Sequence, residues 1–275
     1  MNSEFKVLAR PYKVWLSVLV FFPIIAMIFI SISNLNSSVP FSDIAISFRH
    51  FELLLESSTL IAFRNSLLYA SLTTLISFVL GYFVAYEIKK SKFKNKFILL
   101  TIVILPMWSN LILRTESLSN IMSENNILKS LIGFNIFGNI SGTGIAVLFG
   151  LVFTYMPFMI LSVYTALEKI DFSLEEAALD LGLTPLHKFW KVIFPLSLKG
   201  VVTGSIMVFL PTLAGFAIPK ILSKGRIVFI GNIIENKFIY TNYNHGALLA
   251  IVILIFILGS IFLLTKFDKE GETLL

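Results

Sequence analysis

Long apolar blocks alternate with short charged segments along this chain. Six blocks approach the roughly 20 residues that a helix needs to cross the hydrocarbon core of a membrane. They are residues 14–32, 66–86, 97–113, 145–167, 201–218 and 247–265. The third and fifth blocks are short and are interrupted by Pro106 and Pro211. The pattern predicts an all-α integral membrane protein with about six transmembrane helices, folded as a single transmembrane domain over residues 1–275.

The first block resembles a signal peptide, because Lys6, Arg10 and Lys13 precede it. Its apolar run is longer than a usual signal-peptide core, and residues 31–33 make a poor cleavage site. We therefore predict that this block is an uncleaved first span.

Composition supports the membrane interpretation and excludes several kinds of site. Of the 275 residues, 56% are hydrophobic and only 14% are charged, whereas a soluble domain carries about 25% charged residues. The chain has no cysteine, which excludes disulfides, thiolate metal sites and a cysteine nucleophile. Its three histidines show no metal-ligand spacing. We expect no metal site and no catalytic residues.

The net charge of +6 is explained by membrane topology. Basic residues gather on alternate connections, most densely in the short segment that holds Lys89, Lys90, Lys92, Lys94 and Lys96. The positive-inside rule then places both termini and the loop of residues 168–199 in the cytoplasm. Outside these membrane flanks there is no basic stripe with interleaved aromatic residues, so we expect no nucleic-acid partner.

The loop of residues 168–199 carries the signals of a folded helical hairpin. Ser173 and Glu176 match a capping box, and Gly182 stands where a left-handed residue would end a helix. Thr184 and Pro185 supply an N-cap and a first helical residue, and Pro195 is expected to end the second helix. The pattern predicts helix, glycine turn and helix just outside the membrane.

An apolar stripe at helical spacing gives this hairpin two possible roles. Its members are Leu186, Phe189, Trp190 and Ile193. One interpretation is an interfacial hairpin that lies on the membrane surface. The other is a docking element for a cytoplasmic partner, in which Phe189 and Trp190 fill a pocket and small residues permit close approach.

A spaced motif in the same loop resembles the EAA motif of bacterial ABC-importer permeases. Glu176-Ala177-Ala178 is followed after three residues by Gly182, and after nine more by Val192-Ile193-Phe194-Pro195. The family pattern is E-A-A-x3-G-x9-I-x-L-P. Val192 and Phe194 depart from it conservatively.

Further stretches are similar to the spermidine/putrescine importer permeases, and most to the first of their two permease subunits. They are the LPMWS and LRT segments of residues 105–109 and 113–115, FLP at 209–211, GNIIENKF at 231–238 and GAL at 246–248. The similarity covers roughly residues 60 to 265. Related permeases share much of this pattern, so a permease for another small solute is the alternative.

The resemblance implies a type I ABC-importer permease, a multi-pass protein of the bacterial plasma (inner) membrane with a cytoplasmic coupling-helix hairpin. Its implied partners are two ATPase subunits, a second permease subunit in a heterodimer, an extracytoplasmic solute-binding protein and membrane lipid. The chain has no G-x-x-x-x-G-K-[ST] phosphate loop. We therefore expect a transporter subunit that is not itself an enzyme and binds no cofactor, with ATP and Mg used by the partners. The ATPase-coupling residues that the motif implies are Glu176 as charged contact or cap, with Ala177, Ala178, Gly182, Pro185 and Pro195.

A polyamine is a flexible polycation, so its pathway should offer carboxylates or aromatic faces. No acidic residue lies in the middle of a predicted span. The pathway candidates are therefore Trp108, Tyr155 and Phe216, which lie beside prolines or a glycine, and Glu116, just outside the third span. For each, packing or an interfacial aromatic belt is the competing explanation. Arg114 is expected to form a structural ion pair with Glu116 or to act as an interface anchor.

The sequence disfavours two other classes of function. A membrane-embedded enzyme is disfavoured because the chain lacks H-E-x-x-H, G-x-S-x-G and paired carboxylates inside spans. A purely structural membrane subunit is disfavoured by the EAA spacing.

Overall fold

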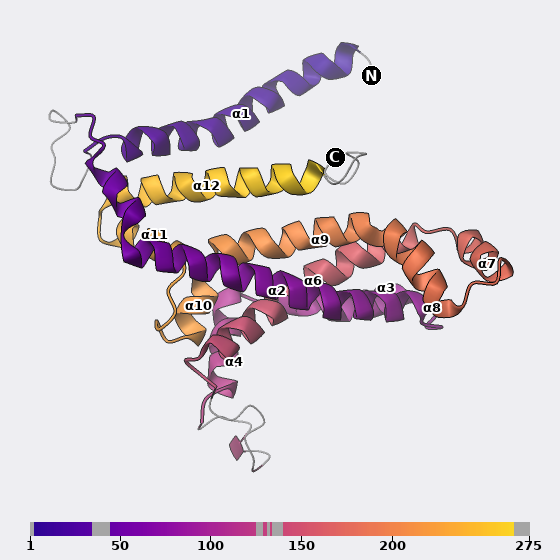
Figure 1. Cartoon of the computed structure of the whole chain (residues 1–275). Helices are drawn as coiled ribbons and strands as arrows, with labels where there is room; N and C mark the ends of the chain where they lie inside the picture. Colours follow the sequence, from indigo (N-terminus) through magenta and orange to yellow (C-terminus); the bar gives the residue numbers. More distant parts are fainter. Residues whose placement is uncertain (1–2, 35–44, 125–128, 131–132, 134–139, 267–275) are drawn as a thin grey trace. The chain divides into compact units, whose positions relative to one another are not determined.

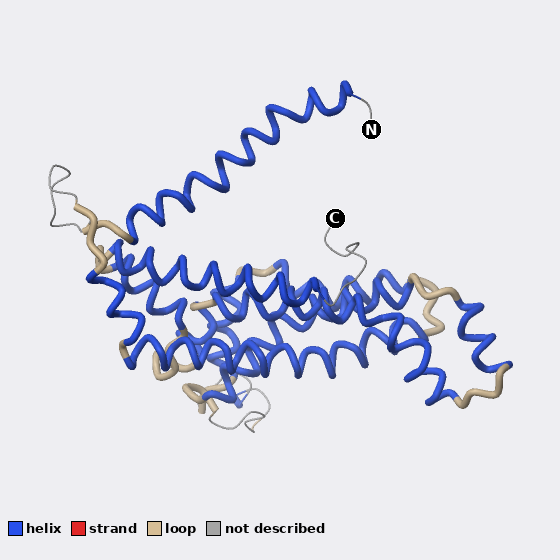
Figure 2. The backbone as a smooth tube through the Cα atoms, turned by 45° about the horizontal axis from the view of Figure 1, so that its top comes forward, coloured by secondary structure: helices blue, strands red, loops and turns tan. Residues whose placement is uncertain are grey.

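The computed structural model describes residues 3–34, 45–124, 129–130, 133 and 140–266. These residues are almost entirely helical, as Figures 1 and 2 show, apart from an isolated antiparallel bridge between Ser33 and Ile46. The elements are α1 (Ser3–Ser31), η2 (Arg49–Leu55), α2 (Ser57–Lys90), α3 (Lys96–Ile104), η3 (Leu105–Trp108), α4 (Leu111–Ile121), α6 (Gly144–Glu168), α7 (Phe172–Asp180), α8 (Pro185–Lys188), η4 (Phe189–Ile193), α9 (Phe194–Ala214), α10 (Ala217–Leu222), α11 (Ile230–Ile239) and α12 (Tyr243–Lys266).

Within the described residues, five helical segments are long and apolar enough to cross a membrane. They are Arg10–Ser31, Ser57–Lys90, Gly144–Glu168, Pro185–Ala214 and Tyr243–Phe262. The third predicted span is not one straight helix: Lys96–Trp108 and Leu111–Ile121 are bent by 92° at a short break. If this bent pair is a single span, the number of spans is six.

Of the four prolines inside predicted spans, Pro23 lies within α1, which continues past it, and the other three have different effects. Pro106 lies in η3, at the break between α3 and α4. Pro157 and Pro211 lie inside α6 and α9, and both helices continue through them. The fifth predicted span instead ends at Gly215, four residues after its proline, and α10 follows.

The chain forms two compact units, each of which includes parts of α2, α11 and α12. Unit 1 holds residues 1–61 and 232–258, and unit 2 holds residues 62–231 and 259–275. Because the two units divide three helices between them, they are not separate domains of the usual kind. The single permease domain therefore stays a prediction. In unit 1, His50 Nδ1 lies 3.1 Å from His245 Nε2, and the Asn244 amide nitrogen lies 3.0 Å from His50 Nε2.

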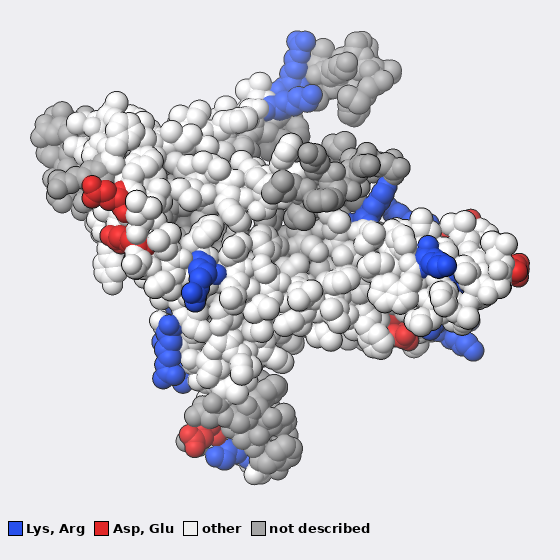
Figure 3. All heavy atoms as spheres, in the orientation of Figure 1, with Lys and Arg blue, Asp and Glu red and all other residues white. Residues whose placement is uncertain are grey.

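Unit 2 is built on the close packing of α6 against α9. Two glycines of α9 allow this approach: a Cβ on Gly200 would lie 2.7 Å from the Ser162 carbonyl oxygen, and one on Gly204 would lie 2.6 Å from the Met159 sulfur. One buried cluster includes side chains of α2, α3, α6, η4 and α9, with Ile160, Val163, Leu167 and Ile193 at its centre. A second cluster joins α4, α6 and α10. In Figure 3 the surface over the middle of α2 carries no charged side chain, as expected for a lipid-facing helix.

Candidate functional site: the EAA hairpin and the α3–α4 bend

The segment with the EAA motif folds as a helical hairpin, here called the EAA hairpin (residues 172–193, comprising α7, α8 and η4). Its first helix begins differently from the prediction. The N-cap is Asp171, whose carboxylate accepts a hydrogen bond from the Ser173 backbone N–H at 3.0 Å. Ser173 therefore lies inside the helix, and the predicted capping box with Glu176 is wrong. Aspartate and serine are both good N-cap residues, so the sequence alone did not decide between Asp171 and Ser173.

The glycine turn agrees with the prediction. Gly182 has a φ of +80°, the left-handed conformation that favours glycine. Its N–H donates to the Leu179 carbonyl and the Leu183 N–H donates to the Ala178 carbonyl, which together make a Schellman motif. The second helix then begins with Thr184 as N-cap and Pro185 in the first turn, also as predicted.

The second arm does not end at Pro195. A π-helical turn over Phe189–Ile193 leads directly into α9, and Pro195 lies in the first turn of that helix. Pro195 has no N–H to donate and stands directly after the π turn, where the regular α-helical hydrogen-bond pattern is already interrupted. The prediction that Pro195 ends the helix is therefore wrong, and the hairpin is continuous with a membrane-spanning helix.

The π turn also splits the predicted apolar stripe. Phe189 and Ile193 pack inward, whereas Leu186 is 66% exposed and Trp190 is 57% exposed. The Phe189 ring lies against Tyr82 and Tyr86 of α2, at centroid distances of 5.7 and 5.2 Å. Phe189 thus fills a pocket of its own chain, and only the other side of the stripe is open to a partner.

The motif residues divide between the surface and the interior. The exposed ones are Glu176, Ala177, Gly182, Pro185 and Pro195. Ala178 is 5% exposed and packs inside. The docking interpretation expected small residues at the surface, but only one of the two alanines, Ala177, faces outward.

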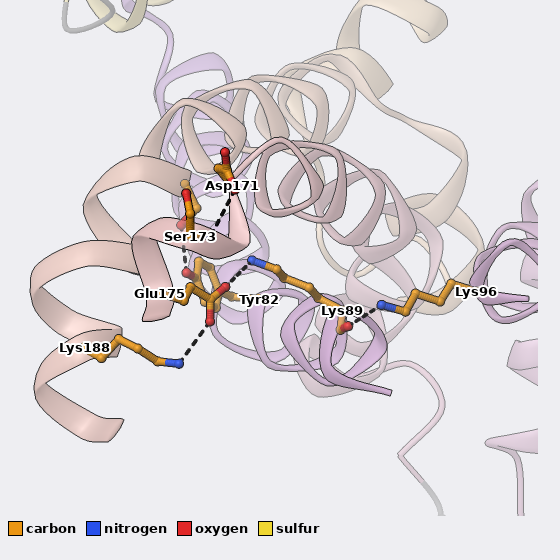
Figure 4. Close-up of polar contacts among 8 residues, drawn as sticks. Tyr82, Lys89, Lys96, Asp171, Ser173, Glu175 and Lys188 are labelled. Atoms are coloured by element: carbon orange, nitrogen blue, oxygen red, sulfur yellow. Dashed lines mark hydrogen bonds and ion pairs between the residues drawn. The ribbon is translucent and has the colours of Figure 1, made fainter. Parts of the chain in front are cut away.

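A glutamate that the sequence analysis did not single out forms the strongest polar contacts of the hairpin. The Glu175 carboxylate accepts from Lys89 Nζ of α2 at 2.7 Å and from Lys188 Nζ of α8 at 3.1 Å (Figure 4). Its side chain is 12% exposed. Burial raises the pKa of Glu175, but the hydrogen bonds and charges of the two lysines lower it more, so that the pKa lies below its ordinary value. No spacing rule links residues 89, 175 and 188, so pattern alone could not find this cluster.

The break between α3 and α4 is held by side chains of the LPMWS and LRT segments. Asn110 caps α4 and accepts from the backbone N–H groups of Ile112 and Leu113 at 2.9 and 3.2 Å. Arg114 donates across the break to the Pro106 carbonyl. No ion pair joins Arg114 to Glu116 in the described part of the chain. The expected ion pair is therefore absent there, the role of interface anchor stays a prediction, and the partner of the arginine is a backbone carbonyl.

A pocket of about 420 Å³ opens beside this bend. It is lined by α4, α6, and the α9–α10 break, and it includes Tyr155 and Phe216. Its other lining residues are Asn110, Leu111, Ile112, Leu151, Pro211, Ala214, Gly215, Ala217, Ile218 and Pro219. The two remaining pathway candidates lie outside it: Trp108 is 86% exposed at the end of η3, and Glu116 is exposed on α4.

The α9–α10 break is itself packed tightly against α11. A Cβ on Gly231 would lie 2.5 Å from the Ala214 carbonyl oxygen and 2.9 Å from that of Gly215. Only glycine fits there, because backbone atoms cannot move aside as a flexible side chain can. The glycine of the GNIIENKF segment is thus explained by packing behind the pocket.

Comparison with protein families identifies the class of the chain. Residues 2–268 match the family described as "Binding-protein-dependent transport system inner membrane component". Among curated proteins, the spermidine/putrescine transport system permease protein PotB of Haemophilus influenzae is 33% identical over 210 residues, which cover 74% of this chain and 73% of that protein. PotB of Escherichia coli is 31% identical over 229 residues, covering 82% and 83% of the two chains.

Solved structures of ABC transporters have the same fold. A bacterial ABC transporter involved in the import of the acidic polysaccharide alginate matches with a TM-score of 0.77 at 16% identity, over 96% of both chains. The inward-facing MetNI methionine ABC transporter matches with a TM-score of 0.55 at 18% identity, over 83% of this chain and 98% of that one. The architecture is therefore the type I ABC-importer permease fold, as predicted from the EAA motif. The chain belongs to the family of binding-protein-dependent transport system inner membrane components.

Proposed function

We propose that this chain is the permease subunit of an ATP-driven importer and forms half of a pathway for polyamines such as spermidine and putrescine. The observation that carries the proposal is the 31–33% identity to PotB proteins over most of both chains. In this proposal a second permease subunit supplies the other half of the pathway. Two ATPase subunits use ATP and Mg, and a solute-binding protein delivers the polyamine from outside.

The EAA hairpin is the proposed contact with the ATPase. Its exposed surface combines the Glu176 carboxylate with the apolar side chains of Leu181, Leu186 and Trp190, which are 83%, 66% and 57% exposed. Exposed aromatic and aliphatic side chains next to a charge are typical of a protein interface. Lys89, Lys188 and Lys191 lie at this end of unit 2, so the positive-inside rule puts the hairpin in the cytoplasm, where ATP is hydrolysed.

The pocket beside the α3–α4 bend is the proposed pathway segment of this subunit. Tyr155 and Phe216 offer aromatic faces to a cation, and such contacts contribute about 0.5–2 kcal/mol each. A second candidate substrate is a less basic small solute, and one observation favours it: none of the residues that line the pocket is acidic. In a polyamine importer the carboxylates that neutralise the substrate would then come from the second permease subunit.

Reconstitution separates these two substrates. The complex of this chain with its ATPase, second permease and binding protein, placed in proteoliposomes, is expected to hydrolyse ATP faster when the binding protein carries spermidine or putrescine. Stimulation by an amino acid or an anion, with no response to either polyamine, would replace the polyamine by another solute.

Two glutamate substitutions test the docking surface. Glu176→Lys is expected to abolish co-purification of the ATPase, because a repulsive charge then stands at the centre of the interface. Glu87→Lys is the matched control, since Glu87 is also exposed but lies on α2, outside the hairpin. If both variants retain the ATPase, the hairpin is not its docking site.

The pathway is tested at Tyr155. Loss of one cation–π contact of about 0.5–2 kcal/mol corresponds to a roughly 2- to 30-fold higher KM for polyamine uptake in Tyr155→Ala. Tyr155→Phe should keep the wild-type KM because the ring remains. Phe153→Ala, two residues away and outside the pocket, is the control. An unchanged KM in Tyr155→Ala would exclude this ring from the pathway.

A further inference from the structure

Glu175 and Glu176 are adjacent on α7 but point into different surroundings. Glu176 is exposed and forms no ion pair with any described residue, whereas Glu175 is bound by two lysines and only 12% of its side chain is exposed. One carboxylate is thus available to a partner, and the other is fully engaged within the chain. Substitution of Glu175 should therefore have a different effect from substitution of Glu176.

The lysines that hold Glu175 come from both sides of the hairpin. Lys188 lies on α8, so its contact closes the hairpin on itself, while Lys89 lies at the end of α2, so its contact joins the hairpin to a membrane-spanning helix. The Lys89 position is fixed in turn, because Lys96 donates a hydrogen bond to the Lys89 backbone carbonyl (Figure 4). The Glu175 carboxylate thus binds α8 and α2 at the same time.

Apolar packing fixes the other arm to the same helix. Phe189 packs edge-on against Tyr82 and Tyr86 of α2, and the Tyr82 hydroxyl lies 2.7 Å from the Ser197 hydroxyl of α9. This contact holds η4, but α7 is separated from it by the glycine turn. Without Glu175, α7 would keep its packing against α8 and η4, including the buried Ala178, but would lose its ion pairs to α2 and α8.

We propose that Glu175 is a positioning residue that joins the EAA hairpin to α2, so that a movement imposed on the hairpin is transmitted to the membrane helices. This role rests on the proposed docking of the hairpin to an ATPase. Force on an element passes to its neighbours only if the element moves as a rigid body. The Lys89–Glu175–Lys188 cluster makes α7 part of such a body, and Glu176 is left free for the docking contact.

The first experiment measures rigidity without any ATPase. Because the chain contains no cysteine, spin labels can be placed on Leu181→Cys in the hairpin and Lys92→Cys after α2, both exposed positions. Pulsed electron paramagnetic resonance of the purified full chain should give a narrow distance distribution. Glu175→Gln and Lys89→Met should broaden it, while Lys89→Arg, which keeps the charge, should restore the narrow distribution. Glu87→Gln is the control, because Glu87 is an exposed glutamate of α2 that forms no ion pair with any described residue.

The second experiment measures coupling in the complete reconstituted transporter. In Glu175→Gln and Lys89→Met the ATPase should still co-purify, but solute transported per ATP hydrolysed should fall about two- to fivefold, the population change expected from losing one partly exposed ion pair. Lys89→Arg should return to the wild-type ratio. A narrow distribution and an unchanged ratio in Lys89→Met would overturn the proposal. Failure of the docking hypothesis looks different: Glu176→Lys would then retain the ATPase, whatever Glu175 does.

Discussion

The EAA hairpin and the α3–α4 bend are both places where a helix of unit 2 is interrupted, but they are stabilised in different ways. The hairpin turns at a glycine in the left-handed conformation and is held by an ionic cluster. The bend follows a 3-10 turn that contains Pro106, and it is held by the Asn110 cap of α4 and by Arg114, which donates to a backbone carbonyl. The hairpin surface carries charges of both signs, whereas the pocket beside the bend is lined by apolar and uncharged residues.

The difference agrees with the surroundings that the sequence predicts for each break, namely water for the hairpin and the membrane interior for the bend. In water, backbone groups freed by a turn can bind solvent, so the turn needs only the right φ and a side-chain contact to fix its direction. Inside a membrane every freed carbonyl needs a partner from the protein. The Pro106 carbonyl accepts from the Ser109 N–H and hydroxyl, and Arg114 adds a charged donor. The basic residue in this apolar stretch thus stabilises a break in the helix by binding a freed carbonyl.

The largest expected effect comes from a substitution that removes the support of both regions. Gly200→Ile places a Cβ 2.5 Å from the Ala166 Cβ and 2.7 Å from the Ser162 carbonyl oxygen, which lies in backbone that cannot rotate away. The cost should reach or exceed the upper end of about 1–3 kcal/mol for overpacking. We expect a large fall in the Tm of the purified permease and loss of uptake.

Gly259→Ile is the matched control for this substitution. Gly259 is also helical, but nothing lies within 4 Å of the Cβ that it would gain. Its Tm should change little. An equal fall in both variants would show that the α6–α9 contact is not the common support of hairpin and bend.

The next effect should be confined to the bend. Arg114→Met leaves the Pro106 carbonyl without its charged donor, a loss of about 1.5–3 kcal/mol. Spin labels on Ile98→Cys of α3 and Ser117→Cys of α4, both exposed, should report a broader distance distribution. Glu116→Gln should leave this distribution narrow. If Glu116→Gln broadened it equally, an Arg114–Glu116 ion pair would be the true anchor.

Sequence reasoning predicted those features that depend on a few adjacent residues. The turn at Gly182 and the start of α8 at Thr184 and Pro185 were predicted, since each needs only local backbone chemistry. Membrane-spanning helices were predicted from the apolar blocks, and the fold class was predicted from the EAA spacing. Tyr155 and Phe216 were singled out for a shared chemistry, and the structure places them at one pocket.

Features that depend on distant partners or on competition between local signals could not be predicted. Glu175 is recognisable only when α2 brings Lys89 to it, 86 positions away in the sequence. Asp171 and Ser173 are both good N-cap residues, and the helix uses Asp171. The π turn shifts the phase of the apolar stripe by part of a turn, so Phe189 faced inward against the expectation. Pattern gave no reason to place a π turn there.

A smaller effect should be confined to the hairpin. Gly182→Val requires a β-branched residue at a φ of +80°, which costs about 1–2 kcal/mol. Gly182→Asn should cost less because asparagine adopts this conformation more readily. No atom lies within 4 Å of the added Cβ, so strain alone accounts for the difference. Broader distances between labels at positions 181 and 92 in the valine variant, with an unchanged α3–α4 bend, would be the supporting result. Equal behaviour of valine and asparagine would show that the left-handed turn is unimportant.

The smallest expected effect is the pH dependence of the ionic cluster. Because the folded state holds the pKa of Glu175 below its ordinary value, this carboxylate stabilises the hairpin at pH values above the usual carboxyl range. The stabilisation is lost as the pH falls through the lowered pKa, where the carboxylate binds a proton and releases Lys89 and Lys188. The loss should be about 1 kcal/mol, near the upper limit for exposed ion pairs. The Tm difference between wild type and Glu175→Gln should therefore be greatest near neutral pH and shrink under acid. Asp171, whose pKa is lowered by hydrogen bonds from Ser173, titrates in both proteins and cancels from the comparison. A difference that stayed constant down to acid pH would mean that Glu175 stabilises the hairpin through packing and not through its charge.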